Sequence, residues 1–386
     1  NFFRSLGLDY LYVGEGNDIP SLVAAFAKVK DTSRPTVVHI HTQKGKGYAP
    51  AEADREEFHW EMPFDLETGK PKVDCSGMED YHSLTGKFLL EKMKEDHTVV
   101  AISSGTPTVI GFTPERRKQA GRQFVDVGIA EEHAVALASG IAAGGGRPVY
   151  GVYSTFIQRC YDQLSQDLCI NGNPAVITVF MGTVAGMNDV THLGFFDIPL
   201  ISNIPNMVYL APTCSEEYFA MLEWAVRQTE YPVAIRVPGV AVVHRKEEFD
   251  TDYSELNRYK MTARGETVAI LALGSFYDFG QALKNKLREE SGVEATLINP
   301  RYITGLDEPM LEELKVGHRI VVTLEDGVLD GGFGEKIARY YGNSEMRVLN
   351  YGLRKEFADR YNLDELMKAN RLTDKQMAED IAGILE

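Results

Sequence analysis

The sequence predicts an α/β protein with more than one domain. Short apolar runs, typical of buried strands, alternate with segments of helical periodicity through residues 79–245 and again through residues 265–386. This alternation indicates a parallel sheet with helices on both faces. A chain of 386 residues also exceeds what one core usually organises. We therefore expect two α/β domains joined by a charged, irregular connection at residues 246–264.

The segment that precedes these domains is expected to be a separate part. Residues 19–29 have helical periodicity, and residues 36–41 form a strand-like apolar run. Residues 1–60 therefore look like the tail of a further α/β domain. Residues 61–78 carry Pro, Gly and charge without periodicity, which predicts a linker. Because the chain starts at Asn1 rather than at Met, we expect it to be the C-terminal part of a longer protein.

The individual elements follow from apolar spacing. In the domain at residues 79–245 we predict strands at 98–102, 148–153, 175–180, 208–211 and 233–237, and helices at 84–93, 131–143, 156–169 and 216–227. In the domain at residues 265–386 we predict strands at 267–273, 294–299 and 319–324, and helices at 277–290, 332–341 and 377–385.

Charge and composition exclude several classes of function. The net charge of -16 disfavours nucleic acid and anionic membrane surfaces as main partners, because both attract basic faces. The four cysteines (Cys75, Cys160, Cys169 and Cys214) form no C-x-x-C pair, which argues against a zinc site and suits reduced thiols in the cytoplasm. No run approaches 18 apolar residues and no signal peptide is recognisable, so we expect a cytoplasmic protein without a membrane span.

The strongest local signal is the pair of acids Glu131 and Glu132 in the stretch I129-A-E-E-H-A-V135. A short strand-like turn delivers these acids to the start of a helix that is rich in Ala and Gly. One explanation is structural, since carboxylates stabilise helix N-termini through the macrodipole. The alternative is that one of the acids has a chemical role.

Several motifs together resemble the pyrimidine-binding domain of the transketolase superfamily, and within it the 1-deoxy-D-xylulose-5-phosphate synthases. They are I129-A-E-E-H-A-V135, Y153-S-T-F-I-Q-R-C-Y-D-Q163 and T191-H-L-G-F-F-D197, with K44-G-K-G-Y-A-P-A-E52 before them and D330-G-G-F-G334 after them. The resemblance implies a thiamine-diphosphate-dependent transferase of isoprenoid precursor synthesis, which decarboxylates pyruvate and joins the two-carbon unit to an aldehyde such as glyceraldehyde 3-phosphate. It also implies a pyrimidine-binding domain, a transketolase-type C-terminal domain and a homodimer.

The resemblance assigns the cofactor-binding roles by register. Glu131 is implied to be the acid that activates thiamine diphosphate, because an acid that can hold a proton at the pyrimidine ring favours the carbanion at the thiazolium carbon. Phe156 is implied to stack on the pyrimidine. Tyr153 and Arg159 are implied to lie near the cofactor, and Lys44 to neutralise its diphosphate.

The substrate roles fall on Arg159, His192 and Asp189. The family has a histidine facing the substrate at the position of His192, and imidazole suits proton transfer near neutral pH. Asp189 fills the family's acidic position only after a one-residue shift, since N188-D189 stands one step later than the family's Asn-Asp. A structural role, as a hydrogen-bonded histidine, remains the alternative for His192.

Two positions depart from the family. F180-M-G-T183 stands where the family has Asp-Arg-Ala-Gly, and R236-V-P-G239 stands where it has Arg-Tyr-Pro-Arg-Gly. Met181 and Gly239 therefore replace two arginines that, in the family, bind the phosphate of the aldehyde. Without these arginines the charge-assisted hydrogen bonds to the phosphate are lost. Either other basic residues bind the phosphate, with Arg159, His244 and Arg245 as candidates, or the acceptor is a different aldehyde.

The superfamily binds Mg²⁺ and diphosphate through Gly-Asp-Gly followed by Asn, a set of oxygen ligands that suits a hard cation. The chain has no Gly-Asp-Gly, and E325-D-G327 with Asn350 lies in the wrong domain for that role. We therefore predict no metal ligands in this chain, place them upstream of Asn1, and expect no cofactor on the chain alone. A subunit of a two-chain transketolase or of a 2-oxo-acid dehydrogenase, and a catalytically silent assembly module, are the alternatives.

Overall fold

The computed structural model describes residues 1–59, 63–73, 77–239 and 241–385. Contacts divide the chain into one unit at residues 1–78 and a second at residues 79–386, and each is described by itself. Cys75 and parts of the predicted linker lie outside the described residues. Among the described helices, none combines the length and the apolar character needed to cross a membrane.

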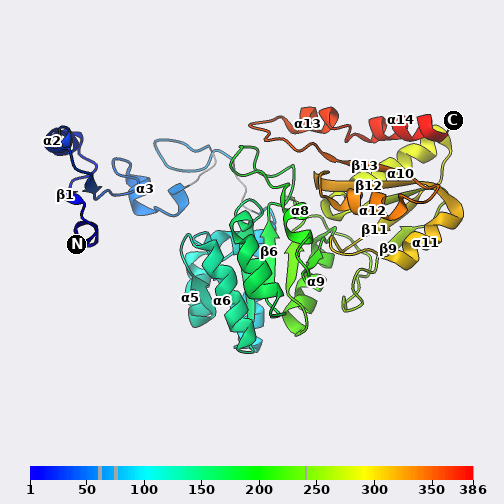
Figure 1. The fold of residues 1–386 in the computed structure, drawn as a ribbon, viewed down its shortest axis with the longest axis horizontal. Helices are drawn as coiled ribbons and strands as arrows, with labels where there is room; N and C mark the ends of the chain where they lie inside the picture. The colour runs from blue at the N-terminus through cyan, green and yellow to red at the C-terminus, as the bar shows by residue number, and fades with distance from the viewer. Residues whose placement is uncertain (60–62, 74–76, 240, 386) are drawn as a thin grey trace. The chain divides into compact units, whose positions relative to one another are not determined.

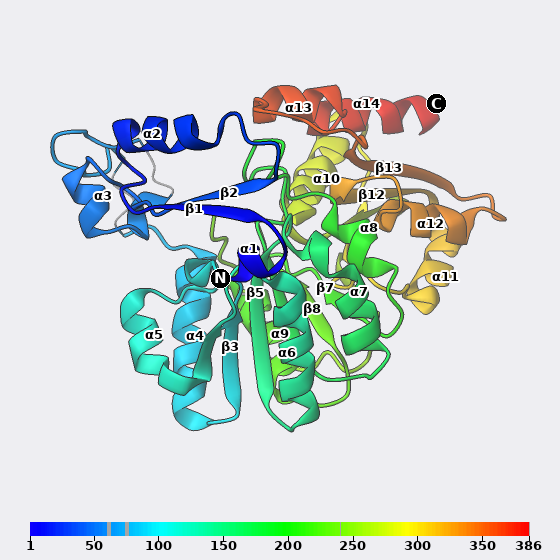
Figure 2. The same cartoon turned by 60° about the vertical axis from the view of Figure 1, so that its left-hand side comes forward.

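The unit at residues 1–78 contains a two-stranded parallel sheet (Figure 2). Its elements are α1 (Phe2–Ser5), β1 (Asp9–Val13), α2 (Ile19–Val29), β2 (Thr36–Ile40), α3 (Ala49–Ala53) and a 3-10 turn (Glu57–His59). The predicted helix and strand are confirmed as α2 and β2. The Asp18 carboxylate caps α2 by accepting a hydrogen bond from the Ser21 amide at 2.9 Å.

A six-stranded, wholly parallel sheet organises the first half of the second unit, in the order β4-β3-β5-β6-β8-β7. Its strands are β3 (Val99–Ser103), β4 (Phe124–Asp126), β5 (Arg147–Tyr153), β6 (Val176–Phe180), β7 (Val208–Leu210) and β8 (Val233–Arg236). Its helices are α4 (Tyr81–Glu95), α5 (Pro114–Ala120), α6 (Glu131–Ala143), α7 (Tyr161–Gln163), α8 (Asp197–Ser202) and α9 (Ser215–Arg227). The predicted parallel sheet is therefore confirmed.

Helices cover both faces of this sheet, which explains its continuous apolar strands. Tyr150 of β5 packs in one buried cluster with Ala138 of α6. The preceding residue, Val149, belongs to a second buried cluster with Leu89 of α4 and Met221 of α9. Adjacent strand residues point to opposite faces, so the two clusters mark the two faces.

The helix predicted over residues 156–169 has a different form. It begins as a 3-10 turn (Ile157–Cys160), passes through α7, and ends as a π-helical turn (Leu164–Cys169). Side chains bind the carbonyl of Asp167 within this wider turn: the Ser139 hydroxyl donates at 2.6 Å and the Asn171 amide at 2.8 Å. Partners from outside the helix are a known cause of such local widening, and apolar spacing does not reveal them.

The second half of this unit has a five-stranded mixed sheet in the order β13-β12-β10-β11-β9 (Figure 1). Its strands are β9 (Lys260–Ala263), β10 (Thr267–Ala272), β11 (Thr296–Asn299), β12 (His318–Val328) and β13 (Arg347–Leu353). Its helices are α10 (Tyr277–Ser291), α11 (Glu308–Gly317), α12 (Phe333–Tyr341), α13 (Leu363–Ala369) and α14 (Asp374–Leu385). Only β9 runs antiparallel, against β11, and the sequence reading missed both edge strands, β9 and β13.

The two sheets share one core. Ile198 and Ile201 of α8 lie in the same buried cluster as Ile303 and Phe333 of the C-terminal half. The backbone adds a direct link, because the Ile303 amide donates to the Tyr209 carbonyl at 2.7 Å. Residues from both halves can therefore be held in a fixed relation at the carboxyl edge of the six-stranded sheet.

Candidate active site at the carboxyl edge of the six-stranded sheet

Glu131 is the first residue of α6 and is held by the turn that follows β4. The Asp126 carboxylate accepts hydrogen bonds from the amides of Gly105 at 2.9 Å and Gly128 at 2.8 Å, which fixes the turn. Gly128 has φ 73°, a conformation that glycine adopts without strain. The Glu131 side chain is buried at 3% exposure, whereas Glu132 is exposed. The fold thus separates two acids that the sequence places side by side.

Arg159 is the charged partner of Glu131. Its Nη1 donates to Glu131 Oε2 at 3.0 Å, and the rest of its side chain is largely exposed. This hydrogen bond, together with the negative charge of Glu131, raises the pKa of Arg159. Because Oε2 is engaged, Oε1 is the Glu131 oxygen that remains for a proton or a ligand.

Two aromatic rings and an imidazole contact one another in a row, and the Arg159 amide binds the carbonyl of the central residue, Phe156, at 3.2 Å. Phe156 follows the end of β5, and its ring centroid lies 5.5 Å from that of Tyr153 and 5.5 Å from that of His192. Both contacts are edge-to-face, a favourable aromatic geometry. Phe156 is only half-buried, so a planar ring can still pack against it.

The loop after β6 presents His192 and Asp189. His192 Nδ1 lies 2.9 Å from Asp189 Oδ1, and the Thr191 hydroxyl donates to the same oxygen at 2.5 Å. The Thr191 hydroxyl and His192 together lower the pKa of Asp189 to about 2. Asp189 is therefore an anion at neutral pH, and it fixes the ring of His192 through Nδ1, which leaves Nε2 for a substrate.

The structure thus brings together six of the predicted residues, which are Glu131, Tyr153, Phe156, Arg159, Asp189 and His192. Lys44 belongs to the unit at residues 1–78 and is described only there, where its Nζ contacts His59 Nδ1.

The residues present suit one half of a thiamine diphosphate site. A buried carboxyl with one available oxygen and a half-exposed aromatic ring fit an aminopyrimidine. For the metal half, no three His, Cys, Asp or Glu side chains gather into a possible ion site within the part of the chain that the structure describes.

The basic residues that were candidates for a phosphate already have acidic partners. His244 lies between Glu216 Oε1 at 2.6 Å and Glu79 Oε2 at 2.7 Å, and these two carboxylates raise its pKa. Arg245 pairs with Asp278 and lies over the ring of Tyr277.

Arg236 is buried and also paired. Its Nε donates to Asp197 Oδ2 at 2.7 Å, and its Nη2 donates to the Asp326 carbonyl at 2.6 Å. This guanidinium therefore acts within the protein core, where it joins the two halves of the unit.

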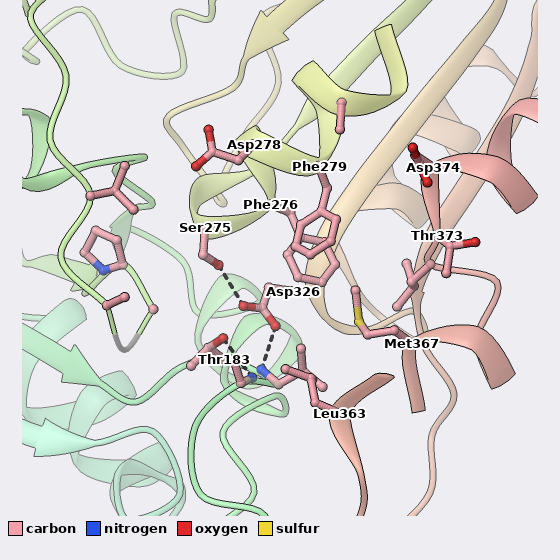
Figure 3. A pocket seen from close by; sticks show the side chains of 18 of the residues that line it. Thr183, Ser275, Phe276, Asp278, Phe279, Asp326, Leu363, Met367, Thr373 and Asp374 are labelled. Carbon is pink, nitrogen blue, oxygen red and sulfur yellow. Dashed lines mark hydrogen bonds between the residues drawn. The ribbon is translucent and has the colours of Figure 1, made fainter. Parts of the chain in front are cut away.

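A cavity of about 630 Å³ lies between the two halves of the unit (Figure 3), and its lining includes Thr183, Val184 and Ala185 from the segment that leads to His192. Its wall is mostly apolar and includes Phe276, Phe279, Met367 and Gly239. The Asp326 carboxylate faces it, accepting hydrogen bonds from the Ser275 hydroxyl and the Val184 amide, both at 2.7 Å.

The sequence reading missed the contribution of the C-terminal half to this region. Asp326, Asp359 and Tyr361 each bind the loop that carries His192. In the sequence, Asp326 stands out only as part of E325-D-G327. No local pattern predicts a role for Asp359 or Tyr361, because that role depends on a contact between distant segments.

Comparison with known proteins identifies both halves of the second unit. Residues 79–242 match the family model of the transketolase pyrimidine-binding domain, and residues 258–377 match that of the transketolase C-terminal domain. The chain is 34% identical to the 1-deoxy-D-xylulose-5-phosphate synthase of Clostridium acetobutylicum over 99% of this chain and 60% of that protein. The synthase of Clostridium tetani is also 34% identical, over 99% of this chain and 61% of that protein. The chain thus spans about 60% of the length of these relatives.

Solved structures agree on the fold. A split-gene transketolase described as an inactive β4 tetramer has a TM-score of 0.65 and 20% identity, over 80% of this chain and 98% of that one. A transketolase from Pichia stipitis has a TM-score of 0.63 and 14% identity, over 99% of this chain and 67% of that one. At these identities the likeness supports the fold alone.

Proposed function

Since the chain belongs to the transketolase family, we propose that it serves a thiamine-diphosphate-dependent transferase that decarboxylates pyruvate and joins the two-carbon unit to an aldehyde. The similarity to 1-deoxy-D-xylulose-5-phosphate synthases supports this reaction. The observation that carries the proposal is the buried Glu131 carboxyl held by Arg159, whose amide in turn binds the carbonyl of the half-exposed Phe156 at 3.2 Å. Thiamine diphosphate, when bound, supplies a stabilised carbanion for the transfer.

The residues of this chain then have distinct tasks. Glu131 holds a proton at Oε1, while Arg159 keeps Oε2 in place. Phe156 packs against the pyrimidine ring. His192, oriented by Asp189 through Nδ1, exchanges protons with the substrate at Nε2. Within the proposal, Arg159 and Asp189 also contact the substrate, Tyr153 supports the cofactor side, and Lys44 neutralises diphosphate.

Replacing Glu131 with Gln in the complete protein tests the assignment. Gln keeps the size and an acceptor for Arg159, but it has no acidic proton to share. We expect turnover of pyruvate to fall by at least about 100-fold, the usual scale for a lost acid–base group. Glu132→Gln is the matched control, because Glu132 is adjacent but exposed, and it should retain turnover. Activity of Glu131→Gln within twofold of the control would contradict the role.

A second candidate function concerns the acceptor: an aldehyde without phosphate. Met181 and Gly239 stand where the family has phosphate-binding arginines. The cavity that Gly239 lines is mostly apolar, and the charged residues of its wall are four acids and one lysine (Asp278, Asp326, Asp364, Asp374 and Lys368). A phosphate gains little from such a wall, because nearby carboxylates repel it.

A competition assay separates the two acceptors. The complete protein is given pyruvate with glyceraldehyde 3-phosphate and, separately, with glyceraldehyde. If the second candidate holds, kcat/KM for glyceraldehyde equals or exceeds that for the phosphorylated aldehyde. A preference of more than about tenfold for the phosphate, which corresponds to ~1.4 kcal/mol, supports the standard synthase reaction instead.

The remaining alternatives are distinguishable by simple measurements. A subunit of a two-chain transketolase requires a separate partner for turnover, and a silent assembly module shows no turnover with any aldehyde. Assembly as a homodimer, Mg²⁺ as the second cofactor and a cytoplasmic location stay predictions. Sedimentation analysis of the complete protein tests the first of these.

A further inference from the structure

The loop that carries Asp189 and His192 belongs to the six-stranded half of the unit, but the C-terminal half holds it. We call residues 184–192 the substrate loop and residues 359–361, between β13 and α13, the strap. We propose that the strap, through Tyr361 above all, positions the substrate loop for the reaction. This inference rests on the proposed function, in which His192 and Asp189 face the substrate.

Hydrogen bonds connect the strap with the beginning, middle and end of the substrate loop. The Tyr361 hydroxyl donates to the Val184 carbonyl at 2.6 Å. The Arg360 amide donates to the Asn188 carbonyl at 2.6 Å, and the Asn188 side-chain amide donates to the Tyr361 carbonyl at 3.1 Å. Nearer to His192, the Val190 amide donates to Asp359 Oδ1 at 3.1 Å.

The beginning of the loop is held from two sides. The Val184 amide donates to Asp326 Oδ1 at 2.7 Å, while its carbonyl accepts from Tyr361. Burial and the charge of Asp326 raise the pKa of Tyr361 to about 12, which keeps its hydroxyl protonated as a donor. Both groups that bind Val184 come from the C-terminal half of the unit.

The beginning of the loop is partly packed, since Val184 is 3% exposed and belongs to a buried apolar cluster, but it also borders a cavity. Val184 and Ala185 line the cavity of about 630 Å³, with Leu363 and Met367 among the residues of its α13 wall (Figure 3). A side chain beside a cavity has fewer partners to hold it. Directional hydrogen bonds from the strap therefore add to the packing of Val184 in holding the beginning of the loop.

The middle of the strap is conformationally demanding. Arg360 has φ 47°, in the left-handed region that non-glycine residues rarely adopt. Such a conformation persists where surrounding contacts fix it, and it often accompanies function. Here it places the Arg360 amide on the Asn188 carbonyl while the neighbours on either side, Asp359 and Tyr361, bind the same loop.

Tyr361→Phe in the complete protein removes one hydroxyl and keeps the ring. Hydrogen–deuterium exchange of a peptide covering residues 184–192 reports on the loop without any need for catalysis. We expect exchange to become about 3- to 10-fold faster, the scale of one lost hydrogen bond. Tyr340→Phe is the matched control: Tyr340 also donates its hydroxyl to a partner, Glu312, but it lies in α12 outside the strap, and it should leave the peptide unchanged.

Kinetics decide whether the loop's position matters for the reaction. With Tyr361→Phe we expect kcat/KM for the substrates to fall about 3- to 10-fold, while the Kd for thiamine diphosphate stays unchanged, because Glu131 and Phe156 lie outside the substrate loop. Asp359→Asn keeps a carbonyl oxygen for the Val190 amide and should retain more activity than Asp359→Ala.

The inference is overturned if exchange in Tyr361→Phe equals that in Tyr340→Phe, or if exchange becomes faster with unchanged kcat/KM. A fall in cofactor affinity equal to the fall in kcat/KM also overturns it, because it indicates general loosening. If the unmutated protein does not turn over pyruvate, the proposed function fails, and the exchange measurement still decides whether the strap holds the loop.

Discussion

Asp197→Ala breaks a buried ion pair within the six-stranded half of the second unit, and its partner Arg236 also binds the Asp326 carbonyl of the C-terminal half. Asp197 is fully buried and Arg236 is 5% exposed. Arg236 donates to both oxygens of Asp197, at 2.7 Å through Nε and 3.1 Å through Nη2, and the Tyr209 hydroxyl also donates to Asp197. Burial alone lowers the pKa of Arg236, but the charges of Asp197 and Asp326 outweigh it and raise that pKa.

The expected loss of folding stability in Asp197→Ala comes from the Arg236 guanidinium, which stays buried without its partner. Removing one partner of a buried ion pair costs about 3–5 kcal/mol, because the other charge stays in the core without compensation. Since whole domains are stable by only about 5–15 kcal/mol, the variant should unfold at much lower denaturant. Asp197→Asn, which keeps one acceptor oxygen for the guanidinium, should lose less.

Fluorescence can follow this half of the unit specifically. The chain has two tryptophans, and Trp224 is buried in α9. In a Trp60→Phe background, urea unfolding followed by the fluorescence of Trp224 gives the urea midpoint and the free energy of unfolding. The double variant Asp197→Leu/Arg236→Met removes both charges and should lose less stability than Asp197→Ala. A loss below about 1 kcal/mol for Asp197→Ala, or strictly additive losses in the double variant, would refute the reasoning.

Three further predictions concern acidity and the site. Burial raises the pKa of Glu325 to about 7, so the folded protein holds this proton more tightly than the unfolded chain. The stability that this proton contributes, up to about 3 kcal/mol, is therefore full below pH ~4.5 and is lost as pH rises through 7. Glu325→Gln should make the melting temperature less dependent on pH between pH 5 and 8. Phe156→Ala should raise the Kd for thiamine diphosphate about tenfold in titrations, whereas Phe156→Tyr should not, consistent with the cost of a lost aromatic contact. Asp189→Asn should lower kcat/KM with little change in that Kd, because Asp189 contacts His192 rather than Glu131 or Phe156.

Features written in local sequence were predictable. The apolar pattern predicted β5, β6, α6 and α10 close to their observed bounds, because the two strands are buried along nearly their whole length and each helix buries one regularly spaced face. Motif register favoured Glu131 over Glu132, and the fold buries the first and exposes the second. The role of Glu131 stays a prediction, but its position beside Arg159 and near Phe156 is consistent with it.

Features that depend on distant contacts were not predictable. The edge strand β13 has a weak apolar pattern, because only its C-terminal half is buried. Nothing local to Asp359 or Tyr361 shows that the strap binds a loop about 170 residues earlier. The partner of Arg236 was equally hidden, although Asp197 ended a recognised motif, because the pairing requires the folded carboxyl edge of the sheet.

These pairings also bear on the acceptor. Phosphate recognition gains most from a guanidinium that has no other strong partner. Arg159, Arg236 and Arg245 each already contact a carboxylate, so a phosphate must displace that partner or share the cation with it. The net gain is the difference between two similar charge-assisted contacts, and a displaced buried carboxylate such as Asp197 adds a cost of its own.

An uncharged aldehyde avoids this competition. It needs only hydrogen bonds from groups such as His192 and an apolar wall, and the cavity beside Gly239 provides such a wall. Restoring a cation should therefore shift the preference. We expect Met181→Arg, measured with pyruvate and the two aldehydes, to raise the ratio of kcat/KM for glyceraldehyde 3-phosphate to that for glyceraldehyde. Met181→Lys is the control, since it adds charge without the planar fork that binds phosphate in two places, and it should raise the ratio less. An unchanged ratio in both variants would show that position 181 does not face the acceptor.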